Sequence, residues 1–510
     1  MRRAGRVEVV VFVVAAAGAC ASGCERREPV SSQPPILRIG AGVPAQGTRG
    51  SGLDYLTSAM TADSWLAQGA DGRLTERLVR EWTWSDDNTV LHLKLRKDVQ
   101  LHDGTRFTPD VAAVAMRETL ASGEYASFAT VRSVEPTGDD SLILRLSEPN
   151  SFLLIDLSLS SVTLTRNKQT LGTGAFEMVK RDEGHAQFRA FSKYYRGRPA
   201  LDEVSVTTYP TQRNAWAALM RGEIDMLHEV SREAAEFVDA ESSVTASKFL
   251  RPYYNGIVFN TRHPVLSNRG VRVALNEAID RSAIVRLSML GQGRPASGPV
   301  WPLHWAYSTA VPEFTYDPAR AAKQLDALGY TVGRAQEPGR MPSRFHFKCL
   351  LVENDSSAER IALRVQRQLY ELGVDMEVVS VKPKEFGRTF IKGDFDAALT
   401  EVIGSRALNW LYILWHSPQP DVPSQLPTGY NAADGALDRF RAATDDADIR
   451  ASVEAMQRVF RDDPPAIFLA WQERSRALSK AFVAPDEGSD DILGTVRQWR
   501  GVPVAKPAAK

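Results

Sequence analysis

A strand, a helix and a second strand follow one another between residues 345 and 381, and this order constrains the fold more than any other feature. Phe345–Val352 is a short apolar run typical of a buried strand. Ser356–Glu359 is typical of a capping box, and apolar residues then recur at helical spacing, namely Ile361, Val365, Leu369 and Leu372. After Gly373, residues 374–378 alternate as a second strand. A helix that joins neighbouring strands in this way leaves them parallel, so the sequence predicts a mixed α/β fold with a partly parallel sheet.

Cap and turn residues predict further elements elsewhere in the chain. A strand starts at residues 36–40, and residues 81–96 alternate around a polar turn, which is typical of a β-hairpin. Helices are predicted after N-caps at Thr108, Thr211 and Asp317. The side chains expected on buried helix faces are Val111, Val114, Ala115, Trp216, Leu219, Met220, Val271, Ala274, Leu275, Ala278, Ile279, Leu325 and Leu328.

The first residues have the pattern of an exported lipoprotein. Three arginines precede the apolar run Val9–Ala19, which is shorter than the ~20 residues of a bilayer-spanning helix and is typical of a signal peptide. Cys24 follows small residues in a pattern similar to a bacterial lipobox; Cys20 is a weaker alternative, and an ordinary secreted protein is another. We therefore expect residues 1–24 to be a signal peptide with lipidation at Cys24. Residues 25–35 are polar and proline-containing, so we expect a tether there.

Length and charge narrow the class of protein. About 485 residues would follow the signal peptide, too many for one hydrophobic core, so two or three domains are expected. Lys+Arg and Asp+Glu number 62 each, and this balance argues against nucleic acid as the main partner. Cys349 is the single cysteine besides Cys20 and Cys24. The exported chain is therefore expected to fold without an internal disulfide.

No motif in the sequence predicts catalysis or a metal centre. His102-Asp103-Gly104 precedes a proline-started helix, where Asp-Gly is ordinary turn chemistry. Gly172-Thr173-Gly174 lacks the third glycine and the helix of a phosphate-binding loop. The eight histidines show no metal-ligand spacing, no Gly-x-Ser-x-Gly elbow occurs, and Cys349 lies in a predicted core strand. We therefore expect no enzyme activity, no cofactor and no metal site.

A series of short segments carries a family resemblance. In chain order they are Asp71–Leu74, Leu78–Trp82, Leu95–Val99, Leu101–Thr105, Phe107–Val111, Gly172–Phe176, Lys193–Gly197, Leu219–Asp225, Phe259–Asn260, Val271–Leu275, Ala278–Arg281 and Tyr316–Ala321. Together they resemble the family 5 extracellular solute-binding proteins, the peptide/nickel class of ABC importers. The similarity extends over residues 36–480 and is strongest between Leu95 and Val111.

The resemblance implies an α/β fold of the periplasmic-binding-protein type (type II, cluster C), with two lobes of mixed sheets plus an extra small domain. Lobe I would comprise residues 36–50, 172–250 and 475–505, the extra small domain residues 51–171, and lobe II residues 251–474. Ligand would lie between the lobes, which would close by a hinge motion. A cleft between two rigid bodies excludes water only when it is occupied, so a permease can detect closure as occupancy.

The segment from Phe395 to His416 is expected to contact the ligand. In peptide-binding relatives the corresponding run carries an aspartate that pairs with the peptide ammonium group, whereas Gly404–Asn409 contains no acid. A truly buried ammonium without that carboxylate would be disfavoured by several kcal/mol. We therefore expect an anionic or neutral ligand, with Arg406 as a fork for carboxylate or phosphate; alternatively, Arg406 faces solvent or pairs with a nearby acid. The candidate ligand-binding residues are Tyr253, Tyr254, Ser405, Arg406, Asn409, Trp410, Trp415 and His416. For Tyr253, Tyr254, Trp410 and Trp415, taken singly, a core position is favoured over a ligand contact.

We therefore expect an exported lipoprotein that captures an oligopeptide or a similar small solute and delivers it to an ABC permease. It would be a monomer held by its lipid in the periplasm or at the outer face of the cell membrane. The main alternative is a relative that has lost transport and acts as a sensor or adaptor, and a cell-surface hydrolase is a third. The sequence does not determine the ligand.

Overall fold

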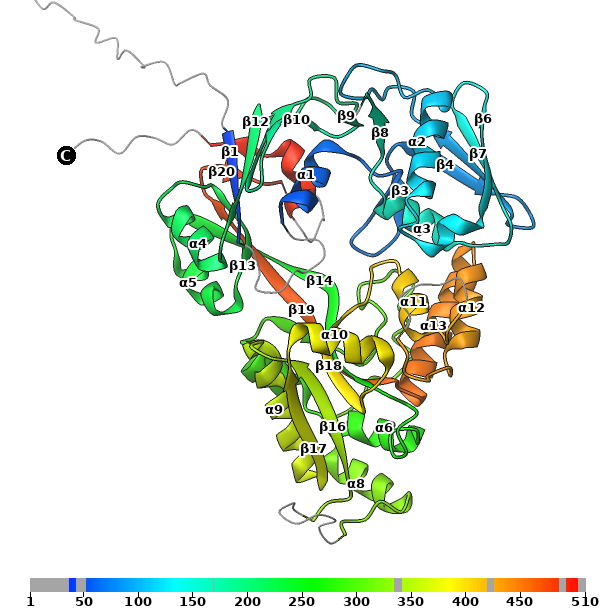
Figure 1. Ribbon diagram of the computed structural model, residues 1–510, viewed down its shortest axis with the longest axis vertical. Coiled ribbons are helices and arrows are strands. Elements are labelled where there is room, and N and C mark those ends of the chain that lie inside the picture. The colour runs from blue at the N-terminus through cyan, green and yellow to red at the C-terminus, as the bar shows by residue number, and fades with distance from the viewer. Residues whose placement is uncertain are drawn as a thin grey trace, which may run out of the picture.

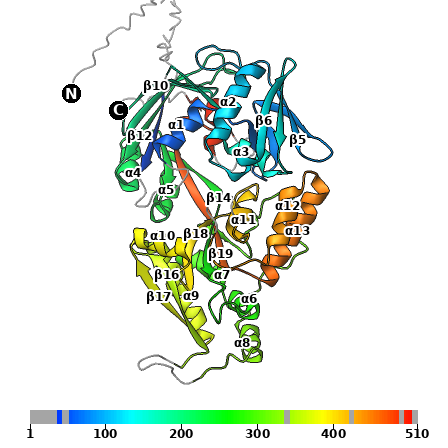
Figure 2. The same ribbon diagram turned by 45° about the vertical axis from the view of Figure 1, so that its right-hand side comes forward.

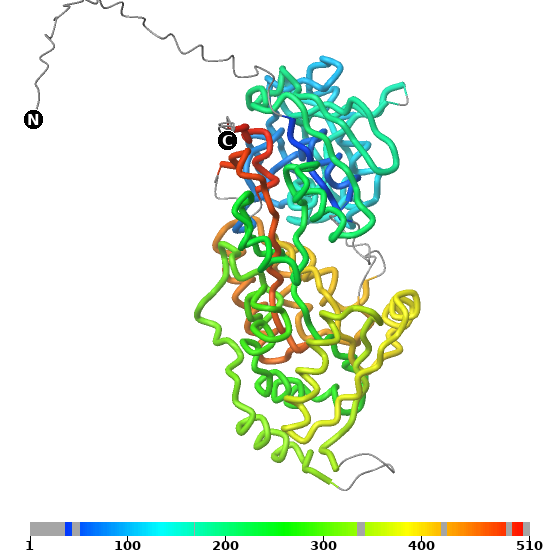
Figure 3. The backbone as a smooth tube through the Cα atoms, turned by 90° about the vertical axis from the view of Figure 1, so that its left-hand side faces the viewer, coloured from blue at the N-terminus to red at the C-terminus, as the bar shows by residue number. Residues whose placement is uncertain are grey.

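The computed structural model describes residues 36–42, 52–167, 169–333, 342–419, 426–485 and 492–502. The predicted signal peptide, the tether, Cys20 and Cys24 lie outside these residues. Two stacked halves give the molecule an elongated profile (Figure 3). We call residues 36–250 and 475–502 the upper half and residues 251–474 the lower half. Within the described ranges, no helix is both long enough and apolar enough to span a membrane.

One mixed sheet of eleven strands passes through both halves (Figure 1). Its strands lie in the order β10 (Phe176–Arg181), β11 (His185–Ala190), β12 (Glu203–Tyr209), β1 (Ile36–Gly42), β13 (Met226–Val230), β19 (Ala466–Ser479), β14 (Val244–Phe259), β18 (Ala397–Ile403), β16 (Phe345–Val352) and β17 (Val374–Val381), and β15 (Gly293–Pro295) pairs with β19. In the upper half β1 runs parallel to β12 and β13. In the lower half β16 runs parallel to β17 and β18.

The two halves are joined by the long antiparallel strands β14 and β19 (Figure 1). These strands contain 16 and 14 residues, and each contributes to the sheet of both halves. Their pairing shifts register between Leu250 and Tyr254, where Pro252 cannot donate a ladder hydrogen bond. The irregular segment therefore lies where β14 passes from the upper half to the lower half.

Helices flank the sheet in both halves (Figure 1). The C-terminal segment returns to the upper half (Figure 3). The upper helices are α1 (Leu53–Thr61), α4 (Gln212–Met220), η2 (Arg232–Ala234), α5 (Ala235–Ala240) and η4 (Ile492–Gln498), near the short pair β20 (Phe482–Val483) and β21 (Arg500–Gly501). The lower helices are α6 (Arg269–Glu277), α7 (Arg281–Ala283), η3 (Ile284–Ser288), α8 (Pro318–Ala327), α9 (Ser356–Glu371), α10 (Pro383–Lys392), α11 (Asn409–Trp415), α12 (Asp434–Ala442) and α13 (Asp446–Asp462).

A second body in the upper half has its own four-stranded antiparallel sheet and its own core. The sheet has the order β4 (Val79–Trp84), β5 (Val90–Leu95), β7 (Ser141–Leu146) and β6 (Val131–Thr137), with α2 (Pro109–Ala121) packed against it. Its other elements are β2 (Leu66–Gln68), β3 (Leu74–Glu76), η1 (Ala126–Thr130), α3 (Phe152–Leu159), β8 (Thr163–Arg166) and β9 (Gln169–Gly172). The buried members of this core all lie between Trp65 and Leu171.

The predicted strand–helix–strand unit is confirmed as β16, α9 and β17. All eight residues of β16 pair in parallel with β17, from Phe345 with Val374 onward. The N-cap of α9 is Asp355 and not Ser356, because the Asp355 carboxylate accepts hydrogen bonds from the amides of Ser357 (3.0 Å) and Ala358 (2.9 Å). The other local predictions, the hairpin β4–β5 and the N-caps Thr108, Thr211 and Asp317, are also confirmed.

The predicted buried helix faces are partly wrong. Val114, Met220 and Leu328 are 43%, 39% and 41% exposed. In α2 the buried face is formed by Ala112, Ala113, Ala115 and Met116. The sequence suggested valines because they are larger and more apolar, but small alanines let a helix approach a sheet closely. The predicted face around α6 is confirmed: Val271, Ala274 and Leu275 in the helix and Ala278 and Ile279 just after it are all buried.

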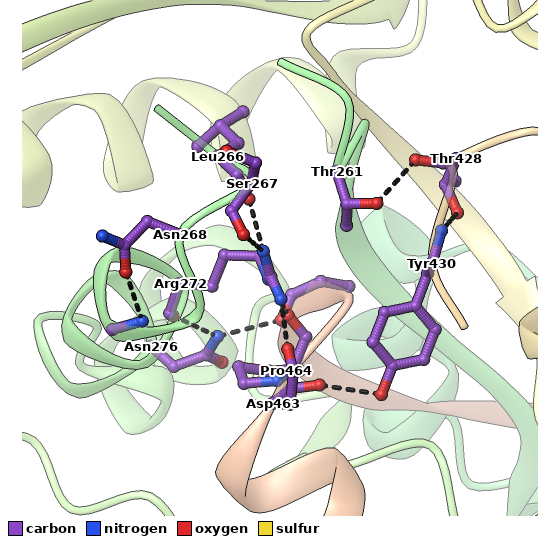
Figure 4. Close-up of polar contacts among 12 residues, drawn as sticks. Thr261, Leu266, Ser267, Asn268, Arg272, Asn276, Thr428, Tyr430, Asp463 and Pro464 are labelled. Atoms are coloured by element: carbon purple, nitrogen blue, oxygen red, sulfur yellow. Dashed lines mark hydrogen bonds and ion pairs between the residues drawn. The ribbon is translucent and has the colours of Figure 1, made fainter. Parts of the chain in front are cut away.

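A buried arginine, Arg272 on α6, connects three segments of the lower half (Figure 4). Arg272 is only 3% exposed. Nη1 donates to the carbonyl oxygens of Leu266 (2.5 Å) and Ser267 (2.8 Å), Nε donates to that of Pro464 (2.9 Å), and Nη2 pairs with the Asp463 carboxylate. The guanidinium therefore holds the start of α6 against the turn between α13 and β19.

Candidate functional site

A cavity of about 1460 Å³ lies where the upper and lower halves meet. The upper half contributes Asp63, which follows α1, and Arg77, which precedes β4. The crossing strands contribute residues 249–253 of β14 and Arg474 of β19. The lower half contributes the segment after β18, including Arg406. Segments far apart in the sequence therefore form one concave surface that is large enough for a peptide-sized solute.

Four of the eight predicted ligand-binding residues line this cavity. They are Tyr253 on β14 and Ser405, Arg406 and Trp410 after β18. Tyr253 lies next to Arg251, whose guanidinium carbon is 4.3 Å from the centre of the tyrosine ring. These four residues remain the candidate ligand contacts.

Two predicted aromatic contacts lie in the core of the lower half. Tyr254 is fully buried and its ring centre is 5.0 Å from that of Trp471. Successive residues of a strand point to opposite faces, so β14 directs Tyr254 away from the side lined by Tyr253. Trp415 packs against Phe468 in the same core. The sequence could not separate these residues from cavity residues because buried and ligand-binding aromatic side chains share one composition.

The other two predicted contacts hold neighbouring elements together. His416 Nε2 lies 3.2 Å from Asp438 on α12, and its ring stacks on Tyr412 at 4.4 Å. Asn409 Nδ2 donates to Asp156 on α3 (2.8 Å), and its Oδ1 accepts a hydrogen bond from Ser405 (2.8 Å). Neither His416 nor Asn409 lines the cavity.

The contact between Asp156 and Asn409 joins the small body to the lower half. Figures 1 and 2 both place α3 beside α11 and α12, and Phe152 of α3 packs against rings of both helices. Asp156 is 4% exposed and also accepts a hydrogen bond from Ser127 (2.5 Å). Burial raises the pKa of Asp156 to about 7, although both hydrogen bonds oppose the change. The run Gly404–Asn409 contains no acid, but the buried carboxyl group of Asp156 from a distant segment contacts it through Asn409.

A glycine explains how closely the halves approach beside the cavity. Gly72 has a φ of +80°, and an added Cβ atom would lie 2.1 Å from the carbonyl oxygen of Arg406. The amide of Trp305 donates to the carbonyl of Asp71 (3.1 Å) in the same contact. Only glycine fits this turn and this approach, which gives a physical reason for the motif at Asp71–Leu74.

Sequence reasoning missed a polar cluster on the upper wall of the cavity. Asp63 is 8% exposed, Arg77 Nη1 lies 3.3 Å from its Oδ1, and the hydroxyl of Tyr194 donates to the same oxygen (3.2 Å). Burial raises the pKa of Asp63, while Arg77 and Tyr194 oppose that shift. Tyr194 belongs to a segment of the family resemblance, but Asp63 follows α1 with no local signal in the sequence.

The motifs that were weighed for catalysis take part in turns, close backbone packing and the buried core. His102 Nε2 is 3.1 Å from the carbonyl oxygen of Gly174, and Cβ atoms added at Gly172 or Gly174 would collide with the backbone at Thr61. The Cys349 thiol is fully buried, and burial raises its pKa to about 12. Among the residues that the structure describes, no three His, Cys, Asp or Glu side chains are grouped so as to hold a metal ion.

The chain is similar in sequence to proteins named for the binding of different ligands. The chain is 24% identical over 390 residues to heme-binding protein A of Haemophilus influenzae, with 68% of this chain and 70% of that protein covered. It is 25% identical over 461 residues to the oligopeptide-binding protein AppA of Bacillus subtilis, with 81% of each covered. The fold is similar to that of the ABC transporter substrate binding protein CtaP of Listeria monocytogenes, with a TM-score of 0.76, 19% identity, and 92% and 99% of the two chains covered.

The match to a protein family extends over most of the chain. Residues 73–420 match the family described as bacterial extracellular solute-binding proteins, family 5 Middle. The same span contains most of the small body, the first crossing strand, and the cavity-lining residues Ser405, Arg406 and Trp410. The two-part sheet and the cavity between the halves agree with the fold of a type II periplasmic binding protein. The chain therefore belongs to the family 5 bacterial extracellular solute-binding proteins, which are binding proteins and not enzymes.

Proposed function

We propose that the protein captures an oligopeptide or a similarly sized solute between its halves and delivers it to the permease of an ABC importer. The observation that carries this proposal is the cavity of about 1460 Å³, whose walls come from both halves. Since β14 and β19 run from one half to the other, a small change in their backbone angles would open or close this space. The protein would act as a monomer, and closure around the solute would be the signal that the permease detects.

We also propose that the halves and the small body correspond to the two lobes and the extra domain. The separate core between Trp65 and Leu171 supports a distinct small domain. Leu56 and Met60 of α1 lie in the core of the upper half, which supports a boundary near residue 62 instead of residue 51. Trp499 of the C-terminal segment lies in that core too, which supports its assignment to lobe I.

Closure on binding is testable by small-angle X-ray scattering. Addition of a bound solute is expected to lower the radius of gyration, because the two halves approach one another about the crossing strands. The solute can be identified by mass spectrometry of the protein purified from its native cell. Trp410→Ala, which truncates a cavity-lining side chain, is expected to weaken both binding and compaction. An unchanged scattering curve across a broad panel of solutes would contradict the proposed function.

Anchoring at the outer face of a membrane is proposed from the sequence alone. Cys24 after the apolar run Val9–Ala19 supports lipidation of the mature amino terminus. Cys24→Ala is expected to release the protein into the soluble fraction and to abolish incorporation of labelled fatty acid. Cys20→Ala is the matched control and should leave both properties unchanged, whereas the reverse result would move the anchor to Cys20.

A further inference from the structure

The crossing strands bring arginines to the floor of the cavity. We define this floor as Phe249, Arg251 and Tyr253 on β14 with Arg474 and Arg476 on β19, all of which line the cavity. The two strands are hydrogen-bonded neighbours, with Phe249 opposite Arg474. Cross-strand neighbours lie only about 5 Å apart at Cβ. Guanidinium groups and aromatic rings are thus concentrated on one surface.

The charged side chains around the cavity do not balance. Among the described lining residues there are six arginines and no lysine, against four acids. Two of those acids, Glu118 and Glu124, are exposed at the rim. The described lining side chains inside the cavity therefore include more positive than negative groups, which favours an anion in a space partly shielded from water.

The two acids inside the cavity are already engaged. Asp63 lies 3.3 Å from Arg77 Nη1, and Glu229 lies 3.0 Å from Arg474 Nε. Glu401 on β18, which is not among the lining residues, pairs with Arg251 at 3.6 Å and accepts a hydrogen bond from Gln472 (2.7 Å). A ligand ammonium would have to compete with an arginine for each of these three carboxylates.

A further arginine, Arg232, adds positive charge near the floor. Arg232 of η2 lies beside the floor and donates to the Ser357 hydroxyl (2.6 Å). Burial, and then the like charge of Arg474, lowers the pKa of Arg232 to about 10. Burial is the larger cause, and Glu401 and Asp355 oppose the shift. The repulsion between Arg232 and Arg474 would be reduced by a carboxylate placed near them.

We propose that the solute is an organic carboxylate without a required ammonium group, and that its carboxylate lies against Arg251 and Arg474 on the floor. A guanidinium fork matches the two oxygens of a carboxylate. The rings of Phe249, Tyr253 and Trp410 provide apolar surface for the rest of the molecule. This inference rests on the proposed function, since it names the class of solute that the same cavity captures.

Three forms of one peptide test the charge preference. Trialanine carries both charges, N-acetyl-trialanine carries only the carboxylate, and trialanine amide carries only the ammonium group. Isothermal titration calorimetry is expected to show that the acetylated form binds at least tenfold more tightly than the amide, with an affinity that falls as salt is added. Equal or tighter binding of the amide overturns the proposal, as does the absence of binding by all three forms.

Two variants test the position of the carboxylate. Arg474→Gln is expected to weaken binding of N-acetyl-trialanine at least tenfold while leaving binding of the amide unchanged or stronger. Arg189→Gln is the control, because Arg189 is also a strand arginine paired with a glutamate, at 2.7 Å, but lies outside the cavity lining. If circular dichroism shows that Arg474→Gln is unfolded, Arg251→Gln provides the same test. Unchanged affinity in a folded variant overturns the proposal.

Different results would contradict the carboxylate preference and the proposed function. Tight binding of trialanine amide together with compaction in scattering would overturn the anionic preference and leave the proposed function intact. The absence of compaction with every solute would contradict the proposed function itself.

Discussion

Replacement of Arg272 by methionine is expected to destabilise the lower half by about 3–5 kcal/mol. The residue is 3% exposed, and its guanidinium satisfies Asp463 and the carbonyl oxygens of Leu266, Ser267 and Pro464. Methionine fills a similar volume but donates no hydrogen bond, so a carboxylate and three carbonyl groups would lose a partner in a buried setting. The stability of Arg272→Lys should lie between that of the natural protein and that of Arg272→Met, because lysine keeps a charge and loses the planar fork.

Urea unfolding followed by circular dichroism measures this loss as a lower transition midpoint. Arg269→Met on the same helix is the matched control, since Arg269 is exposed and its replacement should change stability by less than about 0.5 kcal/mol. Equal midpoints for the two variants would show that the Arg272 contacts do not contribute to stability as the geometry indicates.

Asp156→Asn is expected to stabilise the protein progressively as the pH rises. In the folded chain burial raises the pKa of Asp156 to about 7, and its ordinary value is near 3.9. A raised carboxyl pKa contributes stability that is fully present below pH 4 and is lost as the pH rises through 7. Asparagine avoids the cost of ionisation, accepts from Asn409 through its oxygen, and donates to the Ser127 hydroxyl through its amide.

The difference in stability between Asp156→Asn and the natural protein is expected to be near zero at pH 4 and up to about 4 kcal/mol at pH 8. Denaturant midpoints at several pH values would measure it, and effects of other titrating groups cancel in the difference. Asp86→Asn, at an exposed position of the same body, should show no such trend. A difference that is constant with pH would mean that Asp156 ionises in the folded protein as it does in water.

Local patterns in the sequence predicted elements well and buried faces less well. The unit β16–α9–β17 and the caps Thr108 and Asp317 depend on residues within one turn or one strand of each other. Hydrophobic period alone did not predict that Val114 is exposed, because the face that a helix buries depends on the shape of its partner. The family resemblance supplied the overall architecture, which periodicity alone could not.

The candidate site was predicted only in part. Four of the eight residues line the cavity, three of them in the segment after β18 that was expected to contact the ligand. Arg251 and Arg474 carry no motif, and only the pairing of β14 with β19 brings both to the floor of one cavity. Asp156 and Asn409 are 253 positions apart in the chain and meet in a 2.8 Å hydrogen bond.

The amino-acid sequence by itself determined the α/β class, the strand–helix–strand unit and the likeness to a family of binding proteins, because hydrophobic period, caps and short motifs are local properties of the chain. Only the tertiary structure decided which aromatic side chains are core and which line the cavity, and which arginines share its floor. The physical reason is that burial and charge balance depend on distances between residues that the chain order leaves far apart. Those distances are set by the packing of the two halves around β14 and β19.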